Sequence, residues 1–182
     1  MECGKIPRKW FYGHIQNKDT ESLKEAWCTD YGIEKNDPNV WSMPFESVSE
    51  IKLIELQWKI LHNIYPSGTL LKKMKIKDDE NCVFCGMTDS LVHFFIECDI
   101  ANQAWEEAEK LISCYLGKQF KYSEKARLIG NLGVEGKFDS RQRKYINKIN
   151  LICKFSISKF KYVKEGNIIH LFERQLAFRD VL

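Results

Sequence analysis

Four residues between positions 82 and 98 are spaced as ligands for one metal ion. The stretch reads C-x2-C-x7-H-x4-C, and its donors are Cys82, Cys85, His93 and Cys98. Three thiolates and one imidazole suit a tetrahedral zinc ion. Because four protein donors close the coordination shell, no position is left for an activated water, and the pattern predicts one structural Zn²⁺ rather than a catalytic one. The alternative is a set of ordinary buried cysteines beside a core histidine, which the close spacing disfavours.

The residues around the ligands favour this geometry. Two residues between the first two cysteines let both sulfurs reach one metal, and Gly86 relaxes the turn behind them. If the segment after His93 is helical, Cys98 lies about one turn farther along. We expect Asp99 to cap the helix that follows, which would fix the direction of the last ligand.

The composition is that of a globular chain without a secretory or membrane signal. Of 182 residues, 44% are hydrophobic and 13% aromatic, enough for one domain with a core or two small units. Four of the seven cysteines lie singly and far apart, unlike a disulfide framework. The first residues are polar, so we expect no signal peptide, and no apolar run approaches the roughly 20 residues that span a bilayer. These features predict an intracellular protein of the reducing nucleus or cytoplasm, without a membrane partner.

Positive charge is concentrated in one part of the chain. The net charge is +3, yet residues 118–164 hold 13 Lys and Arg residues against three acidic ones. Such a block favours an anionic partner, RNA or DNA above all, although a solvated helix face has the same composition. The side chains that we expect to contact phosphates are Lys72, Lys73, Lys75 and Lys77 beside the metal motif, and Arg141, Arg143, Lys144 and Lys148 farther along. Phe84 could stack on a base, as aromatic residues do in single-strand binders, or plug the metal loop.

Helical periodicity dominates the elements that must position these residues. Apolar residues at helical spacing predict helices over 20–31, 48–64, 69–77, 99–116, 139–163 and 168–178. The pattern is weak between 118 and 138, where 127–130 is a short strand or turn. The fold class is therefore mainly α, a small zinc-stapled helical domain followed by a basic helical C-terminal region. The expected domains are an N-terminal arm and first helix (1–44), the zinc-binding domain (45–116), a linker (117–138) and the basic C-terminal helices (139–182).

Helical spacing also predicts which side chains face the core and which face solvent. The predicted core stripe of the helix at 48–64 consists of Ile51, Ile54, Trp58, Leu61 and Tyr65. The predicted solvent-facing residues of the helix at 99–116 are Glu106, Glu107 and Glu109. One basic edge of the long helix is expected to hold Arg143, Lys154 and Lys161. The turn formers at 34–39 predict a loop.

The order of motifs in the middle of the chain resembles a known family. The first cysteine pair is preceded by Gln57, Lys59, Leu61 and His62. It is followed by the second ligand pair with Phe94 and Phe95, and then by Trp105. This order resembles the zinc-binding segment at the C-terminal end of reverse transcriptases from non-LTR (LINE-type) retrotransposons, over about residues 45–116. Asn63 and Asp99 depart from that pattern, which has a basic residue and often a proline there. A weaker likeness continues through 150–157.

The resemblance implies the tail of an element protein. The tail is either part of a longer polypeptide with a reverse transcriptase domain or a separate short reading frame. No aromatic-x-Asp-Asp polymerase motif and no endonuclease carboxylate set occur in these 182 residues, so we expect no catalysis by this chain. The expected function is that of a zinc-binding accessory domain that binds nucleic acid. The alternatives are a scaffold domain that contacts other proteins, and a decayed element fragment without activity.

Overall fold

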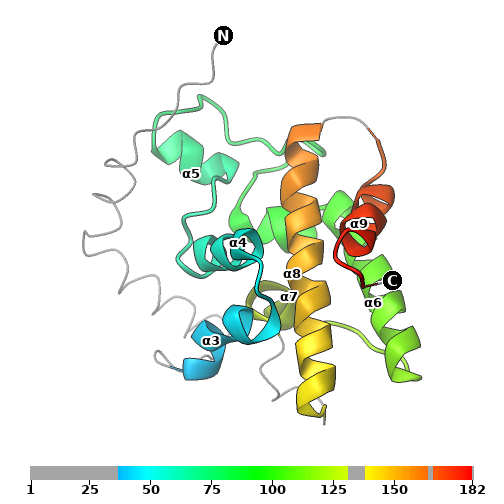
Figure 1. Cartoon of the computed structure of the whole chain (residues 1–182). Coiled ribbons are helices and arrows are strands. Elements are labelled where there is room, and N and C mark those ends of the chain that lie inside the picture. Colours follow the sequence, from blue (N-terminus) through cyan, green and yellow to red (C-terminus); the bar gives the residue numbers. More distant parts are fainter. Residues whose placement is uncertain (1–36, 131–137, 164–165, 182) are drawn as a thin grey trace. The chain divides into compact units, whose positions relative to one another are not determined.

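Figure 1 shows the computed structural model of the chain, in which residues 37–130, 138–163 and 166–181 are described. These residues are mainly helical, and the extended pairing among them is an isolated bridge between Asn81 and Thr88. The predicted mainly α fold class is therefore confirmed. No helix in the described ranges is both long and apolar enough to cross a membrane. The helix predicted over 20–31 and residues 131–137 of the predicted linker (117–138) lie outside them.

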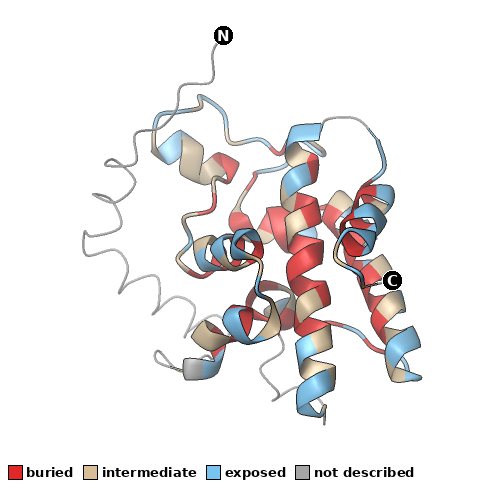
Figure 2. Cartoon of the chain, in the orientation of Figure 1, coloured by how far each residue is buried: buried red, intermediate tan, exposed pale blue. Residues whose placement is uncertain are grey.

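The long helix α8 (Ser140–Val163) is the element on which the others pack. Its middle turns are buried, as Figure 2 shows in red, because Ile149, Ile152 and Ile157 are excluded from solvent. The helices that pack most extensively on it are α3 (Pro38–Ser47), α4 (Ile51–Leu61), α6 (Asp99–Leu116) and α9 (Ile168–Ala177). The predicted limits of α6, α8 and α9 agree with these bounds to within one residue. Of two shorter elements, α5 (Gly68–Lys73) precedes the metal motif and the π-helix η1 (His93–Glu97) lies within it.

Helix α3 was not predicted, because its residues look like a loop followed by an apolar connection. Proline suits the first turn of a helix, where its missing N–H has no intrahelical partner to lose. Val40 and Met43 are buried, and α3 contacts both α4 and α8. Part of the loop predicted at 34–39 is therefore helical, since packing against α8 outweighs the local turn signals.

Helix α4 buries a different face from the predicted one. Its buried residues are Leu53, Leu56, Gln57, Ile60 and Leu61. Of the predicted stripe, Leu61 and Tyr65 are buried, whereas Ile51 is 77% exposed and Trp58 also faces solvent. The helix carries two apolar stripes, and the core takes the one with Gln57 because this amide finds partners there. Its Nε2 donates to the carbonyl oxygen of Leu128 at 2.9 Å.

A short helix, α7 (Glu124–Ile129), stands where the sequence predicted a strand or turn. The hydroxyl of Ser123 accepts from the N–H of Ala126 at 3.0 Å and begins this helix. Arg127 then donates to the carboxylate of Glu109 on α6 at 3.1 Å. The prediction that Glu109 faces solvent is wrong, since this ion pair fixes α7 on α6 and keeps its carboxylate buried.

Residues Pro38–Leu182 form one compact unit, with the predicted zinc-binding segment and the predicted basic helices around a common core. These two segments were predicted as separate domains, whereas α8 of the second packs on α4 and α6 of the first. Lys154, which was expected on a basic edge, is fully buried instead. Its Nζ donates to Gln57 Oε1 and to the Leu128 carbonyl oxygen, both at 2.7 Å. Partners about 97 and 26 residues away in sequence keep this lysine in the core.

Candidate zinc centre

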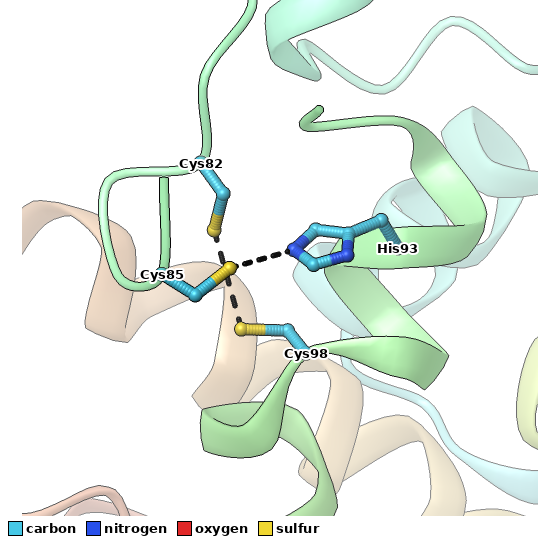
Figure 3. A group of neighbouring side chains, drawn as sticks. All are labelled: Cys82, Cys85, His93 and Cys98. Atoms are coloured by element: carbon cyan, nitrogen blue, oxygen red, sulfur yellow. Dashed lines mark hydrogen bonds between the residues drawn. The ribbon is translucent and has the colours of Figure 1, made fainter. Parts of the chain in front are cut away.

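The first two predicted ligands lie on a tight turn. The N–H of Cys82 donates to the Met87 carbonyl at 2.7 Å, and the N–H of Gly86 donates to the Cys82 carbonyl at 2.9 Å. Gly86 has a φ of 78°, in the left-handed region that glycine adopts without strain. Both sulfurs consequently point to the same side of the turn, as Figure 3 shows.

The other two ligands lie at the ends of one wide helical turn. The N–H of Cys98 donates to the His93 carbonyl at 2.9 Å, a five-residue step that belongs to a π-helix. An ordinary α-helical turn was the expectation, whereas the hydrogen bond that closes this turn spans five residues instead of four. The imidazole and the last thiol therefore both point at the first cysteine pair (Figure 3).

Cys98, rather than Asp99, is the N-cap of α6. Its backbone is extended, with φ −65° and ψ 134°, and Asp99 is the first residue of the helix. The predicted cap is therefore displaced by one position. The carboxylate of Asp99 still lies at the positive end of the helix dipole, where negative charge is stabilising. The last ligand is fixed in direction because it joins η1 to α6.

The four donor atoms are close enough to hold one metal ion, since all lie within 4.8 Å of one another. The sulfurs of Cys82 and Cys98 are 4.0 Å apart, and Cys85 Sγ is 3.2 Å from His93 Nε2. A tetrahedral zinc ion with Zn–S bonds of about 2.3 Å holds two sulfurs about 3.8 Å apart. The donor types and the spacing fit zinc.

Burial disfavours the thiolate form of the Cys98 side chain unless a cation is bound. Desolvation raises the pKa of the Cys98 thiol to about 12; the backbone amide of Ile100 lowers it and the neighbouring Cys82 raises it. Two adjacent buried thiolates repel each other, whereas a bound metal ion deprotonates coordinating thiols and balances their charge. The chemistry of this donor set is therefore metal coordination.

Groups behind the ligands hold them in place. His93 Nδ1 lies 3.6 Å from the carboxylate of Glu97, while Nε2 faces the sulfurs. A carboxylate behind a ligating histidine is a common device for orienting the ring. Trp105 is fully buried, and its indole N–H donates to the Phe95 carbonyl at 2.7 Å. This bond fastens η1 to α6.

Asp89 holds the loop between the two ligand pairs, and the sequence analysis did not single it out. Its buried carboxylate accepts from the N–H of Gly68 at 2.7 Å and from Lys161 Nζ at 2.9 Å. A Cβ on Gly68 would lie 2.8 Å from both the Asp89 Cβ and the Glu80 carbonyl oxygen, so glycine is required there. An aspartate among polar loop residues gives no sequence signal that it is buried. Helix α8 thus holds the metal loop through Lys161.

The predicted phosphate contacts lie at two ends of α8. Near its C-terminal end, Lys161 reaches the Pro66 carbonyl at 3.2 Å, just before α5 with Lys72 and Lys73. Arg141 and Lys144 stand in the first turns of α8. A helix rises about 1.5 Å per residue, so roughly 30 Å separates the two groups. They do not form one continuous surface.

The individual side chains differ in their exposure to solvent and in their polar partners. The exposed ones are Lys72, Lys73, Lys75, Arg141 and Lys144, and the half-buried ones are Lys77, Arg143 and Lys148. Lys72 lies 3.3 Å from Glu80, and Lys77 lies 4.0 Å from Asp79. Lys148 donates to the Arg179 carbonyl at 3.4 Å.

Phe84 at the tip of the first turn packs onto the body of the protein. Its ring is half-buried, with its centroid 5.4 Å from the Phe160 ring and 6.4 Å from the Phe94 ring. These contacts match the interpretation of Phe84 as a plug between the metal loop and α8. Base stacking by Phe84 would have to displace them.

The fold and the site together define a mainly helical protein with one zinc centre. A family model described as zinc-binding in reverse transcriptase matches residues 22–105, a stretch that contains all four ligands and Trp105. The match begins earlier than the resemblance noted over 45–116, and it supports the zinc-binding part of that resemblance. Neither a curated protein nor a solved structure matches the chain.

Proposed function

We propose that this chain is a non-catalytic accessory domain of a non-LTR retrotransposon reverse transcriptase, in which zinc holds the helices together and basic side chains bind nucleic acid. The observation that carries the proposal is the set of four close protein donors. Such a set leaves no open coordination position for a substrate or an activated water, so the ion is structural. The family match supports the reverse transcriptase context.

The distribution of charge supports a nucleic acid as the partner. Residues 118–164 carry most of the excess positive charge, and Arg141 and Lys144 among them are exposed. Exposed lysines also lie in α5 (Lys72 and Lys73) and just after it (Lys75), beside the metal loop. A reducing compartment, the nucleus or the cytoplasm, preserves the thiolate ligands and holds the expected partner.

Salt dependence tests the proposal. The zinc-loaded protein is titrated into labelled single-stranded oligonucleotides at several salt concentrations between about 50 and 200 mM. We expect log affinity to fall linearly with log salt, with a slope of about −0.7 for each phosphate contact. Lys110→Ala is the control, because this exposed lysine pairs with Glu107 outside the basic block. An affinity that does not change with salt contradicts nucleic-acid binding.

A scaffold domain is the second candidate, favoured by exposed apolar side chains on two adjacent helices. Phe45 of α3 is 65% exposed and Ile51 of α4 is 77% exposed. Apolar groups of this size in solvent favour contact with another protein surface. Co-purification with a reverse transcriptase domain that survives nuclease treatment would identify this function.

A further inference from the structure

Aromatic rings and cations lie together where the C-terminal end of α6 meets the N-terminal end of α8. The ring of Tyr115 stacks on the ring of Tyr145, with 4.0 Å between centroids and 24° between planes. Tyr115 nevertheless remains 44% exposed. The stack therefore covers one side of its ring and leaves the rest in solvent. Figure 1 shows both helix ends at the lower edge of the molecule, and Figure 2 shows the first turns of α8 largely in pale blue.

Two exposed cations stand close to this pair along the chain. Lys118 follows α6, and its Nζ lies 4.9 Å from the centroid of the Phe138 ring, just before α8. Arg141 stands one helical turn before Tyr145, so the two side chains share a face of α8. No ion pair engages Lys118 or Arg141 among the residues that the structure describes. The nearby carboxylate of Asp139 accepts from the N–H of Gln142 at 2.8 Å and caps the helix.

The surface formed by Tyr115, Lys118, Arg141 and Tyr145, called here the stacking platform, differs from the zinc end of the molecule. At the zinc end, Phe84 is packed against two rings, and Lys72 and Lys77 have acidic neighbours. On the stacking platform, one ring is open to solvent and the cations beside it have no acidic partner in the described ranges. An open aromatic face and exposed cations without an acidic partner are the two features that single-strand binders combine.

We propose that the stacking platform binds single-stranded nucleic acid, with one base on the open side of Tyr115 and adjacent phosphates on Lys118 and Arg141. Bases in a duplex are stacked on each other and cannot reach such a ring, so a single strand is the matching ligand. This inference rests on the proposed nucleic-acid binding and deepens it, because it moves the contact away from the zinc loop.

Binding of oligo-U and oligo-dT of equal length, measured by fluorescence anisotropy, tests the platform. We expect Tyr115→Leu, which keeps apolar cover over Tyr145 but has no ring, to weaken binding about fivefold or more. Tyr115→Phe keeps the ring and should bind as the wild type does. Phe178→Ala is the matched control, since Phe178 is 79% exposed at the end of α9 and lies near Arg179. Zinc content and helical circular dichroism verify that each variant folds.

The cations give a second readout. Lys118→Ala and Arg141→Ala should each reduce the magnitude of the salt slope by about 0.7. If the wild type binds with salt dependence but Tyr115→Leu binds equally well, the stacking platform is overturned and the proposed nucleic-acid function stands. If the wild type binds neither oligonucleotide, both are overturned. If the wild type binds a duplex as tightly as a single strand, the stacking platform is also overturned. A difference in affinity between oligo-U and oligo-dT identifies RNA or DNA as the strand bound.

Discussion

Lys154 and Lys161 stand about two turns apart on one side of α8, and they meet contrasting surroundings. Lys154 is buried in the core, where it donates to the uncharged oxygens of Gln57 and Leu128. Lys161 reaches the carboxylate of Asp89 beside the metal loop. The contacts of Lys154 with Gln57 and Leu128 are called the core junction. The contacts of Asp89 with Lys161 and the N–H of Gly68 are called the loop junction.

The difference lies in whether the lysine carries a charge in the folded protein. Burial lowers the pKa of Lys154 well below its usual value, and its two hydrogen-bond acceptors match the two N–H groups of a neutral amine. In the loop junction, Lys161 and the N–H of Gly68 compensate the buried Asp89 carboxylate. The core junction depends on packing and on the two hydrogen bonds of Lys154, whereas the loop junction also requires an ordered metal loop.

Metal removal should separate the two junctions and has the largest expected effect. Structural zinc supplies on the order of 10 kcal/mol in small zinc-binding peptides, comparable to the whole stability of a domain. We expect Cys98→Ser to lose stoichiometric zinc and the order of residues 81–98, and with them the loop junction. Hydrogen exchange followed by mass spectrometry should show faster exchange there and continued protection of the middle of α8.

Cys114→Ser is the matched control for this experiment. Cys114 is an exposed cysteine on α6 outside the ligand cluster, so its replacement should leave zinc content and exchange unchanged. A Cys98→Ser protein that keeps one zinc ion and a protected loop would show that the cluster does not hold the metal. Equal loss of protection at both junctions would show that the core junction depends on the metal as well.

Breaking the loop junction directly should have a smaller effect. Lys161→Met leaves the buried Asp89 carboxylate with the Gly68 N–H alone, and removal of one partner from a buried ion pair costs about 3–5 kcal/mol. Urea unfolding of the zinc-loaded protein measures this loss. Lys159→Met is the control, because Lys159 is exposed one position before Phe160 on the same helix. Equal stability of the two variants would mean that the Asp89–Lys161 pair contributes nothing.

Spacing in the sequence was sufficient for the metal ligands and the long helices, because both are local patterns. The motif over 82–98 predicted four donors that the structure brings together, and helical periodicity placed α6 and α8 correctly. The π-turn between His93 and Cys98 was not predictable, since a five-residue spacing is compatible with either kind of helical turn. The buried face of α4 was not predictable either, because the partners of Gln57 lie far along the chain.

Local sequence patterns predict where the two lysines lie on α8, but not which residues surround them. Helical spacing places Lys154 and Lys161 on one edge of α8, and this placement is correct for the backbone. Their surroundings depend on Gln57, Leu128 and Asp89, which no local pattern connects to α8. A lysine in an amphipathic helix is most often solvated, so the buried Lys154 contradicts the usual expectation.

The smallest expected effect is the pH dependence of stability that the core junction causes. Because burial lowers the folded-state pKa of Lys154 below the unfolded value of about 10.4, the unfolded chain binds a proton that the folded chain lacks. In the pH window between these two pKa values, the stabilisation by Lys154 therefore rises with pH and is lost as pH falls. The slope is at most about 1.4 kcal/mol per pH unit.

Lys154→Met removes this proton linkage while keeping an apolar chain of similar length in the core. The free energies of unfolding of the wild type and the variant are compared in urea between about pH 7 and 9.5. Groups that do not interact with Lys154 contribute equally in both proteins, so their contributions cancel in the difference. We expect the wild type to gain stability relative to Lys154→Met as pH rises. A constant difference would mean that Lys154 keeps its proton in the folded protein, and the two junctions would then both hold a charged lysine.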